Sequence, residues 1–412
     1  MRFKEQRVPK ADLIEQQIRG NGGLTNFEPH RAALTFHPPT HIVARVRRTI
    51  VFSNYDSPGN PYYGGGGARA IHEVARRLAE RHAVRVITGS YPGSREELVE
   101  GVSYGRLGGA WAGPKLGQLL YQFLLPRRVR GERFDLWVES LTPPFSTACL
   151  QWFTRKPVIA LTQILAGRAM SRKYHLPFGT LERHGLKTYR YAIALSGHLK
   201  QELERANPSL RVAVIPNGVN RELIEQEVEP GRAHVLFLGR LDVEQKGIDL
   251  LLEAWSAIAA TMPAPLVIAG GGAAADTAFV ARRIEELRLG ASVRAVGRVE
   301  GDQKDRLLRQ AMFLVMPSRF EASPVVLLEA LCYRLPVVLF GIPELLELPD
   351  ACCVKVRPFD TRAYGQAALE LARDTPRRLA AGAAAKQLAR LFDWDDLARK
   401  YEEFFETVLQ SG

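Results

Sequence analysis

The chain has 412 residues, of which 46% are apolar and 24% are charged, and this composition is typical of a soluble globular protein with two domains of ordinary size. No run of about 18 apolar residues occurs, so the sequence predicts no transmembrane helix. The 56 basic and 44 acidic residues give a net charge of +12, which favours acidic partners such as phosphorylated ligands or an anionic surface. The alternative is that this charge only aids solubility.

Nucleic acid is the other usual partner of a basic chain. The sequence contains no zinc-finger, RNP-like or basic-zipper pattern, and its basic residues are dispersed, so we expect no nucleic-acid partner. Cys149, Cys332, Cys352 and Cys353 are spaced for neither a disulfide framework nor a zinc site. Together with a start that lacks an apolar signal core, this favours a cytoplasmic location and no bound metal.

Residues 1–48 form an irregular segment with nine Lys or Arg and four Asp or Glu. Pro and Gly are scattered through it, and no apolar periodicity is present. We therefore expect a basic N-terminal extension of the folded protein.

From Thr49 the sequence alternates between apolar runs and helical patterns. A strand at 49–56 and a glycine-containing loop at 57–68 precede a helix at 68–82, whose Ile71, Val74, Ala75 and Leu78 share one face. Further strands are predicted at 83–89, 134–140, 156–162, 191–196 and 211–218. This alternation predicts βαβ units on a parallel sheet, in a Rossmann-like domain at 49–216.

The same theme repeats in a second predicted domain at 217–390. Strands are expected at 234–240, 265–272, 293–299, 313–318 and 336–340, with a helix at 246–258 after the first. A last helix near residues 391–412 has an apolar face, which we expect to cross back to the first domain: Leu397, Tyr401, Phe404, Phe405 and Val408. The predicted fold class is therefore α/β, with two Rossmann-like domains facing across a cleft, where the C-terminal ends of the strands bind ligands.

Two glutamates in the segment SRFEASPVVLLEALCYRLPVV raise the question of function. Glu321 lies in a predicted strand-to-helix loop, with Ser323 as helix N-cap and Pro324 as first helical residue. Glu329 lies in a helix predicted to be buried nearly all round, where an unsatisfied carboxylate costs several kcal/mol. A ligand with hydroxyl groups, such as a ribose, would satisfy it. The alternative is a solvated loop acid and a helix acid paired with a nearby arginine.

Two cations follow the first strand of the second domain. Gly239 and Arg240 come directly after the strand, and Lys246 with Gly247 opens the next helix. A diphosphate would suit these charges and the backbone N–H groups of a helix start. Arg and Lys in an ordinary surface loop are the alternative.

The glycines at 64–67 allow a backbone to approach a ligand closely, or they form a flexible surface loop. Gly65-x-Gly67-x-x-Ala70 is also a loose dinucleotide fingerprint, so a nicotinamide-dependent two-domain dehydrogenase is one alternative. The distance from the strand to the glycines and the lack of an acid after the next strand disfavour it.

Several segments closely resemble the retaining glycosyltransferases of family four, which have the GT-B fold. The resemblance covers roughly residues 49–410 and is most specific, in combination, at 235–254, 265–272, 315–338 and 341–346. Weaker matches lie in GGGGA, FDLWVES, IALS and VIPNGV. The E-x7-E motif of the family falls on Glu321 and Glu329.

The resemblance implies transfer of a sugar from a nucleotide-diphosphate sugar, with a UDP-sugar expected, to a glycan, glycolipid or small metabolite. It implies retention of the anomeric configuration and neither metal nor cofactor. Arg240 and Lys246 would bind the diphosphate and stabilise the leaving nucleotide, Glu329 would hold the ribose, and Glu321 the donor sugar. The implied catalytic residues are thus Glu321, Arg240 and Lys246. The rest of the implied donor site comprises Gly239, backbone at Gly297 and Arg298 near the base, Ala322, Ser323 and Pro324, with Gly65, Gly66 and Gly67 approaching from the other domain.

Two departures from the family leave alternatives open. Gln163 stands where the family usually has a histidine near the donor sugar, and the stretch at 335–346 is shorter than usual. A catalytically silent GT-B protein that binds nucleotide sugars is therefore a second hypothesis. Separately, residues 113–134 couple apolar residues to Arg127, Arg128, Arg130 and Arg133. This segment is interpreted either as an ordinary amphipathic helix or as a segment that contacts the inner face of an anionic membrane peripherally.

Overall fold

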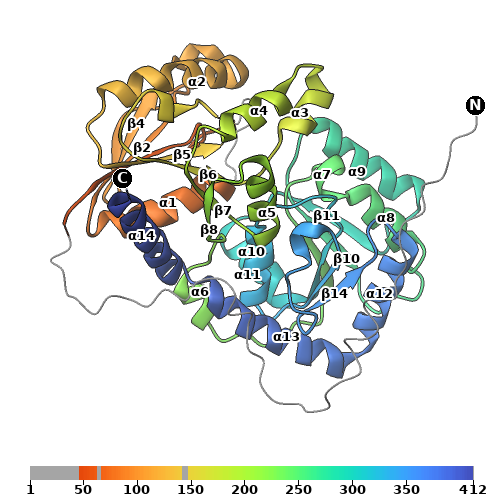
Figure 1. Ribbon diagram of the computed structural model, residues 1–412. Coiled ribbons are helices and arrows are strands. Elements are labelled where there is room, and N and C mark those ends of the chain that lie inside the picture. Colours follow the sequence, from red (N-terminus) through yellow and green to blue (C-terminus); the bar gives the residue numbers. More distant parts are fainter. Residues whose placement is uncertain (1–45, 63–65, 142–146, 412) are drawn as a thin grey trace, which may run out of the picture. The chain divides into compact units, whose positions relative to one another are not determined.

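The fold of this protein is described here from a computed structural model that covers residues 46–62, 66–141 and 147–411 (Figure 1). Nearly all of the predicted N-terminal extension, residues 1–45, lies outside the described residues. Within them, two mainly parallel sheets are formed, each from one half of the chain. We propose domains at 49–216 with about 391–412, and at 217–390, a division that keeps each sheet in one domain.

The first half of the chain alternates short strands with helices, as predicted. Its elements are β1 (Thr49–Ser53), α1 (Gly66–Ala79), β2 (Ala83–Gly89), β3 (Glu97–Val99), β4 (Val102–Leu107), η1 (Ala110–Ala112), α2 (Gly113–Gly131), β5 (Leu136–Leu141), η2 (Leu150–Trp152), β6 (Val158–Thr162), α3 (Gly167–Tyr174), α4 (Phe178–Leu186), β7 (Tyr191–Ala194), α5 (Gly197–Ala206), β8 (Arg211–Val214) and α6 (Arg221–Glu225).

The second half repeats this alternation and ends in three helices. Its elements are β9 (His234–Leu238), α7 (Val243–Lys246), α8 (Ile248–Ser256), β10 (Leu266–Ala269), α9 (Ala274–Glu286), β11 (Val293–Gly297), α10 (Gly301–Gln310), β12 (Ala311–Met316), α11 (Val325–Cys332), β13 (Val337–Phe340), η3 (Pro343–Leu345), β14 (Cys353–Val356), α12 (Thr361–Arg373), α13 (Thr375–Ala389), η4 (Arg390–Phe392) and α14 (Trp394–Gln410).

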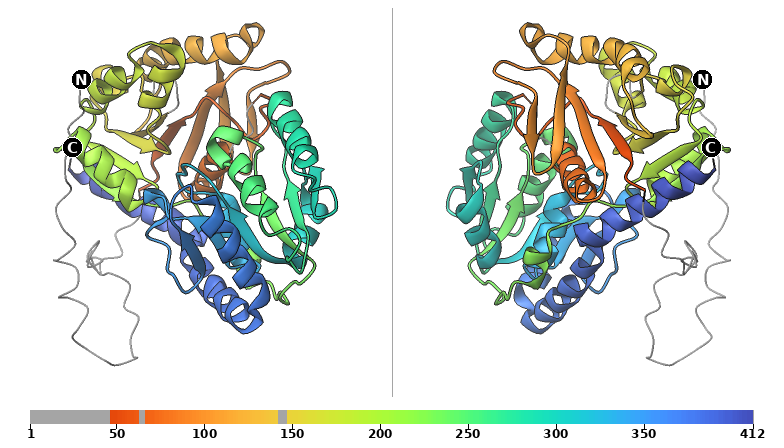
Figure 2. Two further views of the ribbon diagram at one scale, coloured as in Figure 1. Left: turned by 90° about the vertical axis from the view of Figure 1, so that its right-hand side faces the viewer. Right: turned by 90° about the vertical axis from the view of Figure 1, so that its left-hand side faces the viewer.

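The first sheet has the order β3-β4-β2-β1-β5-β6-β7-β8, and only β3 runs antiparallel to its neighbour. Successive side chains of β1 point to opposite faces. Ile50 and Phe52 join the core under α1 and α14, whereas Val51 joins the core under α2, α4 and α5. Figure 2 shows helices on both faces of this sheet. The β3–β4 hairpin was not predicted, because β3 is exposed throughout and lacks an apolar pattern.

The second sheet has the order β11-β10-β9-β12-β13-β14, and all its strand pairs are parallel. This is the doubly-wound order of Rossmann folds, in which the winding reverses between the first and fourth strands, here β9 and β12. Both are buried, which explains why their sequences are almost continuously apolar. The helix predicted at 246–258 is α8, which begins two residues later, and the short α7 before it was not predicted. Gly247, in a left-handed conformation with φ of +63°, separates the two helices.

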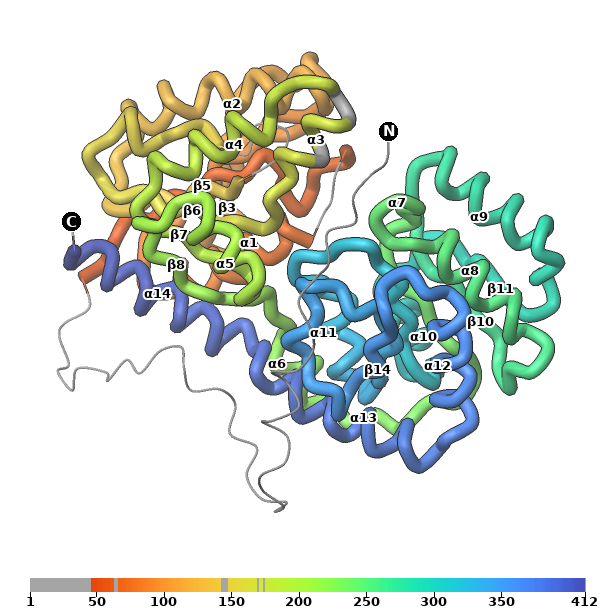
Figure 3. Tube along the Cα trace, turned by 45° about the vertical axis from the view of Figure 1, so that its right-hand side comes forward, coloured from red at the N-terminus to blue at the C-terminus, as the bar shows by residue number. Residues whose placement is uncertain are grey.

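The chain returns to the first sheet through its last helix, as predicted. Val219 N donates to Phe392 O at 2.8 Å, and Trp394 N donates to Val219 O at 3.1 Å, so two distant segments are held side by side. After this crossing α14 packs against α1, as Figure 3 shows. Its predicted apolar face is confirmed: Leu397, Tyr401, Phe405 and Val408 are buried, and Phe404 is partly buried. Among the helices of the described ranges, none combines the length and the apolar character needed to cross a membrane.

A buried carboxyl group lies near the C-terminal end of β5. Glu139 is 2% exposed, and it accepts hydrogen bonds from Ala148 N at 2.6 Å and from the Tyr189 hydroxyl at 2.5 Å. Burial raises the pKa of Glu139 to about 7, although the hydrogen bonds act in the opposite direction. In the unfolded chain the pKa of glutamate is about 4.3. The folded protein therefore binds a proton that the unfolded chain has lost, throughout the interval between these two values.

We predict that Glu139 makes the protein less stable as the pH rises from about 5 to about 8, because deprotonation in the folded state is disfavoured. Glu139→Gln, which cannot ionise, should gain on the order of 1–3 kcal/mol relative to the wild type across this interval. Thermal unfolding at several pH values measures the difference. Glu80→Gln, at an exposed position, is the control and should follow the wild type. Parallel pH profiles for Glu139→Gln and the wild type would contradict the prediction.

Candidate functional site

The predicted charged residues meet where the winding of the second sheet reverses. Gly239 and Arg240 directly follow β9, and the loop at 317–324 follows β12, the neighbouring strand. Because both strands run in the same direction, their following loops leave from one edge of the sheet. This is the position at which open α/β sheets bind ligands.

Lys246 and Glu321 form an ion pair between the two loops of this region. Lys246 Nζ lies 2.6 Å from Glu321 Oε1, and the Ser318 hydroxyl donates to the same oxygen at 2.6 Å. Glu321 is only 5% exposed, so it is the more buried of the two glutamates, and the alternative of a solvated loop acid does not hold for it. Its charge is neutralised within the protein by Lys246.

Arg319 holds the two loops in this arrangement, and the sequence had not identified it. Its guanidinium donates to Asp249 Oδ1 at 2.9 Å and to Oδ2 at 2.6 Å, and also to Val243 O at 2.9 Å. The hydrogen bonds to Asp249 raise the pKa of Arg319 above its usual value. Gly247 permits the close approach, since a Cβ there would lie 2.1 Å from Pro317 O. The loop after β12 is thus fastened to α7 and to the start of α8.

Arg240 lies on the same edge but does not contact Glu321. Its guanidinium donates to Gln245 Oε1 at 2.6 Å and lies 3.3 Å from Asp242 Oδ2. Asp242 also caps α7 by accepting from Gln245 N at 2.8 Å. Arg240 is exposed, so this cation can reach a ligand without loss of a buried contact.

Glu329 is half-buried and paired, which corrects two expectations. Lys304 Nζ, from α10, lies 2.6 Å from Glu329 Oε1, whereas the paired residue in the alternative hypothesis was an arginine. The second oxygen, Oε2, is buried and has no hydrogen-bond partner among the described residues. Val325, Val326 and Glu329 are only partly buried, so α11 is not buried all round, because its first turn and the Glu329 side lie outside the core.

The start of α11 also differs from the prediction. Pro324 is the N-cap rather than the first helical residue, and the Ser323 side chain does not cap the helix. The Ser323 hydroxyl accepts from Asn217 N at 3.2 Å, and Asn217 Nδ2 donates to Ser323 O at 2.9 Å. Ala322, Ser323 and Pro324 are partly buried. Asn217, in the segment that follows β8, thereby fixes the loop that carries Glu321.

The first sheet contributes Gly66, Gly67 and Gln163 to the same region. Gly66 and Gly67 form the first turn of α1, not a loop, while Gly65 lies outside the described residues. A Cβ at Gly67 would lie 2.1 Å from Gln163 Oε1, so the Gln163 amide rests directly on this glycine. A Cβ at Gly66 would meet Val325 Cγ2 at 3.6 Å, which places the start of α1 beside the start of α11.

Gly297 and Arg298 lie at the end of β11, which β10 and β9 separate from β12. Gly297 has φ of +73°, in the left-handed region, and its carbonyl accepts from Gly270 N at 2.7 Å. Arg298 is exposed and lies 2.6 Å from Glu300, and this hydrogen bond lowers the pKa of Glu300. In the described ranges, no group of three or more His, Cys, Asp or Glu side chains is arranged to hold a metal ion.

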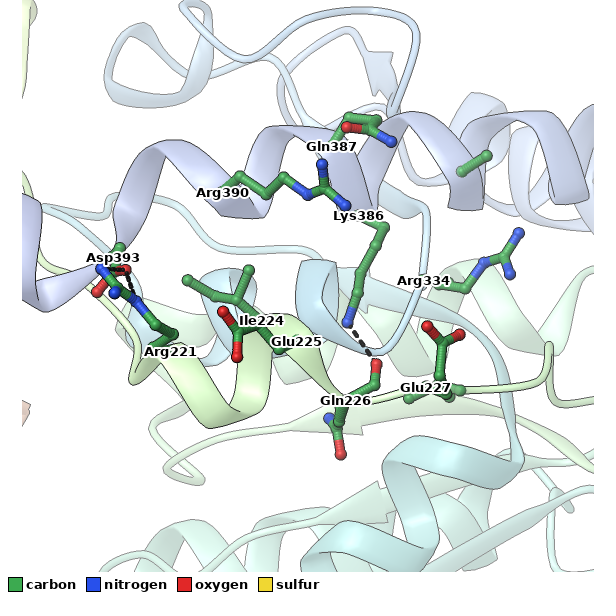
Figure 4. A pocket seen from close by; sticks show the side chains of 12 residues that line it. Arg221, Ile224, Glu225, Gln226, Glu227, Arg334, Lys386, Gln387, Arg390 and Asp393 are labelled. Carbon is green, nitrogen blue, oxygen red and sulfur yellow. Dashed lines mark hydrogen bonds and ion pairs between the residues drawn. The ribbon is translucent and has the colours of Figure 1, made fainter.

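A cavity of about 620 Å³ lies elsewhere, between α6 with the segment after it and α13 (Figure 4). Lys386 spans it by donating to Gln226 O at 2.9 Å and to Cys332 O at 2.8 Å. Burial lowers the pKa of Lys386. None of the predicted site residues lines this cavity, and its central cation is used to join backbone segments. We therefore propose the sheet edge, rather than this cavity, as the candidate functional site.

The arrangement at the sheet edge combines separate ligand-binding groups. An exposed arginine and a paired lysine can bind an anion, while two carboxylates can accept hydrogen bonds from hydroxyl groups. The unpartnered oxygen of Glu329 provides one such acceptor in the ligand-free protein. Such a set suits a ligand that carries both a diphosphate and several hydroxyls.

Two family models match the chain. Residues 64–223 match the model described as Glycosyltransferase Family 4, and residues 232–374 match the model described as Glycosyl transferases group 1. The first matched segment contains β2 to β8 of the first sheet but not β1, and the second contains all strands of the second sheet. The two matches favour a glycosyltransferase over the dehydrogenase alternative.

Curated relatives match in part. An uncharacterized glycosyltransferase of Methanocaldococcus jannaschii is 28% identical over an alignment of 247 residues, and the match covers 55% of this chain and 62% of that protein. A glycogen synthase of Mycobacterium tuberculosis is 29% identical over an alignment of 277 residues, with 60% of this chain and 65% of that protein covered. A phosphatidyl-myo-inositol mannosyltransferase of Mycobacterium leprae is 29% identical over an alignment of 208 residues, with 48% of this chain and 54% of that protein covered. The chain thus spans between half and two thirds of the length of these relatives.

Solved structures match over most of the chain. Sucrose-phosphate synthase from Thermosynechococcus elongatus superposes with a TM-score of 0.72 at 19% identity, covering 89% of this chain and all of that one. WaaG, a glycosyltransferase involved in lipopolysaccharide biosynthesis, gives 0.66 at 18% identity, covering 86% of this chain and 99% of that one. The Anabaena protein HepE, in complex with UDP and glucose, superposes with a TM-score of 0.66 at 15% sequence identity. The match covers 88% of this chain and 100% of that one. The predicted GT-B fold is confirmed.

We predict that Lys246 and Glu321 are strongly coupled in stability. Lys246→Met leaves a buried carboxylate unpaired, which should cost about 3 kcal/mol in the free energy of unfolding. Glu321→Gln should cost less, because Lys246 can still reach solvent, and the double variant should recover about 1–3 kcal/mol of the summed losses. Urea unfolding of the ligand-free proteins measures all four states.

The pair Arg282–Glu286 on α9, in which both residues are exposed, is the matched control. The same cycle there, with Met and Gln, should give a coupling below about 0.5 kcal/mol. Strictly additive losses at Lys246 and Glu321 would show that the two charges do not depend on each other.

Proposed function

Because the chain belongs to the family 4, group 1 type of glycosyltransferases, we propose that it transfers a sugar from a nucleotide-diphosphate sugar to an acceptor hydroxyl. The observation that carries the proposal is the contact of Lys246 with Glu321, beside Arg240, at the point where the second sheet reverses its winding. A UDP-sugar is the proposed donor. The Anabaena neighbour in complex with UDP and with UDP-glucose supports this choice.

The donor diphosphate would bind to Arg240 and Lys246. In the ligand-free protein each cation already has a partner of the protein, Gln245 for Arg240 and Glu321 for Lys246. An arriving diphosphate would compete with these partners for the two cations. Glu321 would then accept a hydrogen bond from a hydroxyl of the donor sugar in place of the Lys246 ammonium.

The nucleoside would bind between α11 and the end of β11. Glu329 keeps one buried oxygen without a partner, and a ribose hydroxyl could donate to it, while Lys304 holds the other oxygen. We assign the backbone at Gly297 and Arg298 to the base. Gly239, Ala322, Ser323 and Pro324 complete the proposed donor site.

The first sheet would close the site around the reacting sugar. Gly66 and Gly67 begin α1 without side chains, so their backbone could approach the diphosphate, and Gly65 is proposed to continue this approach. Gln163, which rests on Gly67, would offer its amide to a sugar hydroxyl. Unlike the histidine usual in the family, an amide does not change charge near neutral pH.

The proposed reaction is a substitution at the anomeric carbon with retention of configuration. The bond from this carbon to the diphosphate breaks with its electron pair on the phosphate oxygen, and the acceptor oxygen forms the new bond on the same face. The acceptor proton passes to the leaving phosphate. Arg240 and Lys246 would stabilise the departing charge, a role that a metal ion fills elsewhere, so we propose a metal-independent enzyme.

We propose a glycan, glycolipid or small metabolite as acceptor, bound by the first domain, and a cytoplasmic protein that contacts the inner face of a membrane peripherally. The second candidate function is a catalytically silent protein that binds nucleotide sugars. Gln163 at the place of the usual histidine favours this alternative. Turnover of the donor separates the two functions.

We predict that Arg240→Ala combined with Lys246→Ala abolishes UDP binding, because both cations of the diphosphate site are lost. Titration calorimetry measures the affinity, and circular dichroism verifies the fold. Arg240→Ala alone should weaken binding without loss of stability, since Arg240 is exposed. Wild-type protein with UDP at 100 times its Kd should gain about 2.7 kcal/mol in stability.

Arg282→Ala, an exposed cation on α9, is the control and should bind UDP as the wild type does. A chelator should leave turnover unchanged. Wild-type affinity in the double variant would remove these two residues from the donor site, and a strict metal requirement would contradict metal independence.

We predict different kinetic effects for the two glutamates. Glu329→Gln should mainly raise KM for the donor, because the ribose is bound equally in the ground and transition states, whereas Glu321→Gln should mainly lower kcat. Loss of one charged hydrogen bond corresponds to roughly tenfold in each case. Steady-state kinetics and NMR of the product anomer are the measurements. Glu285→Gln on α9 is the control, and wild-type kinetics in both variants would disprove the E-x7-E assignment.

A further inference from the structure

Helix α2 has a buried face and a distinct exposed face. Every fourth residue is buried against the first sheet: Gly117, Tyr121, Leu125 and Val129. The opposite stripe holds Leu116 and Phe123, which are 45% and 70% exposed, followed by the exposed Arg127 and Arg130. Positions 116, 123, 127 and 130 fall within about 60° of one another around a helix of 3.6 residues per turn. This outer helix is the orange-gold one at the top of both views in Figure 2.

The charges of α2 are all of one sign. Its 19 residues contain no Asp or Glu and four cations. Arg128 is paired with Glu132 at 2.8 Å, whereas Lys115, Arg127 and Arg130 are exposed. A soluble surface helix usually mixes both signs on its outer face. The exposed side of α2 instead combines large apolar side chains with positive charge.

Exposed aromatic side chains from two other segments lie near the two ends of α2. Trp111, in η1, precedes α2 and is 78% exposed, and Trp152, in η2, is 71% exposed. Both short helices pack against α2, and Arg130 lies 4.8 Å from the ring centre of Phe153, next to Trp152. Trp111 therefore lies at the N-terminal end of α2 and Trp152 near its C-terminal end, and α2 is about 28 Å long.

The distribution of tryptophan shows that this exposure is local. The chain has five tryptophans. The other three, Trp137, Trp255 and Trp394, are buried at 0%, 1% and 5% exposure. Both exposed tryptophans thus lie beside α2. Exposed apolar side chains that are gathered in one place, unlike single scattered ones, mark a binding surface.

We propose that this face, formed by Trp111, Leu116, Phe123, Arg127, Arg130 and Trp152 and called the α2 face below, binds an anionic lipid bilayer. Tryptophan prefers the boundary between lipid headgroups and acyl chains, and Leu and Phe enter the acyl region beneath it. Lys and Arg on the same face attract the negative headgroups. The absence of acidic residues from α2 removes the repulsion that such a surface would otherwise meet.

The test uses the full chain with vesicles of phosphatidylcholine, with and without phosphatidylglycerol, at low and high salt. The protein should sediment with the anionic vesicles at low salt and be released by salt. Tryptophan emission should shift to shorter wavelength on binding, since two tryptophans leave water. No sedimentation with anionic vesicles would overturn the proposal.

Two variants identify the face. Arg127→Gln with Arg130→Gln should weaken binding about 25-fold, at roughly fivefold per charge near the surface. Trp111→Ser with Trp152→Ser should abolish the emission shift, because the remaining tryptophans are buried. The matched control, Arg282→Gln with Leu391→Ser, changes an exposed cation and an exposed leucine elsewhere and should bind as the wild type does. Wild-type vesicle binding in the first two variants would overturn the proposal.

Light scattering tests the competing occupant, a second copy of this chain. A wild-type dimer that both α2-face variants convert to a monomer would assign the surface to self-association and overturn the proposal, whereas equal molar masses support it. All variants should keep the melting-temperature increase caused by UDP. This readout separates a failure of the membrane proposal from a failure of the donor site, because the α2 face contains no proposed donor-binding residue.

Discussion

A nearly buried carboxylate needs a cation within reach, and this requirement organises the second half of the molecule. Glu321 is 5% exposed, and its partner Lys246 stands 75 positions earlier in the chain. The pair can form only if the loops after β9 and β12 are adjacent, which the order of the second sheet ensures. Arg319 then fixes the spacing of these loops through Asp249 and the carbonyl of Val243. The buried charge of Glu321, the order of the strands and the contacts of Arg319 therefore depend on one another.

Most of the fold could be predicted because its signals are local. Parallel strands buried on both faces have nearly continuous apolar sequences, and His234–Leu238 and Ala311–Met316 are clear examples. The amphipathic pattern of Trp394–Gln410 likewise identified its buried face correctly. Glu97–Val99 was missed since it is fully exposed and carries no periodicity. The short α7 was also missed, and the break at Gly247 between α7 and α8 accompanies the close approach of Pro317, which is distant in sequence.

The candidate site was predictable in its residue types but not in its contacts. Strand ends located Arg240, Lys246 and Glu321, because each follows a recognisable apolar run. Which glutamate is more buried could not be inferred, since burial depends on packing between segments far apart in the chain. Lys304 and Arg319 gave no signal at all, because a single cation in a polar stretch is ordinary. The bidentate contact of Arg319 with Asp249 can be predicted only once the two loops are known to be neighbours.

The return of α14 to the first sheet has a consequence for biosynthesis. The core beneath α1 contains Phe52 from β1 and Phe405 from α14, which are separated by most of the chain. A ribosome releases these segments in order, so the first sheet emerges long before the helix that covers one of its faces. Until residues 394–410 leave the exit tunnel, an apolar surface of the nascent chain stays open to water. This surface is where a chaperone would be needed during translation.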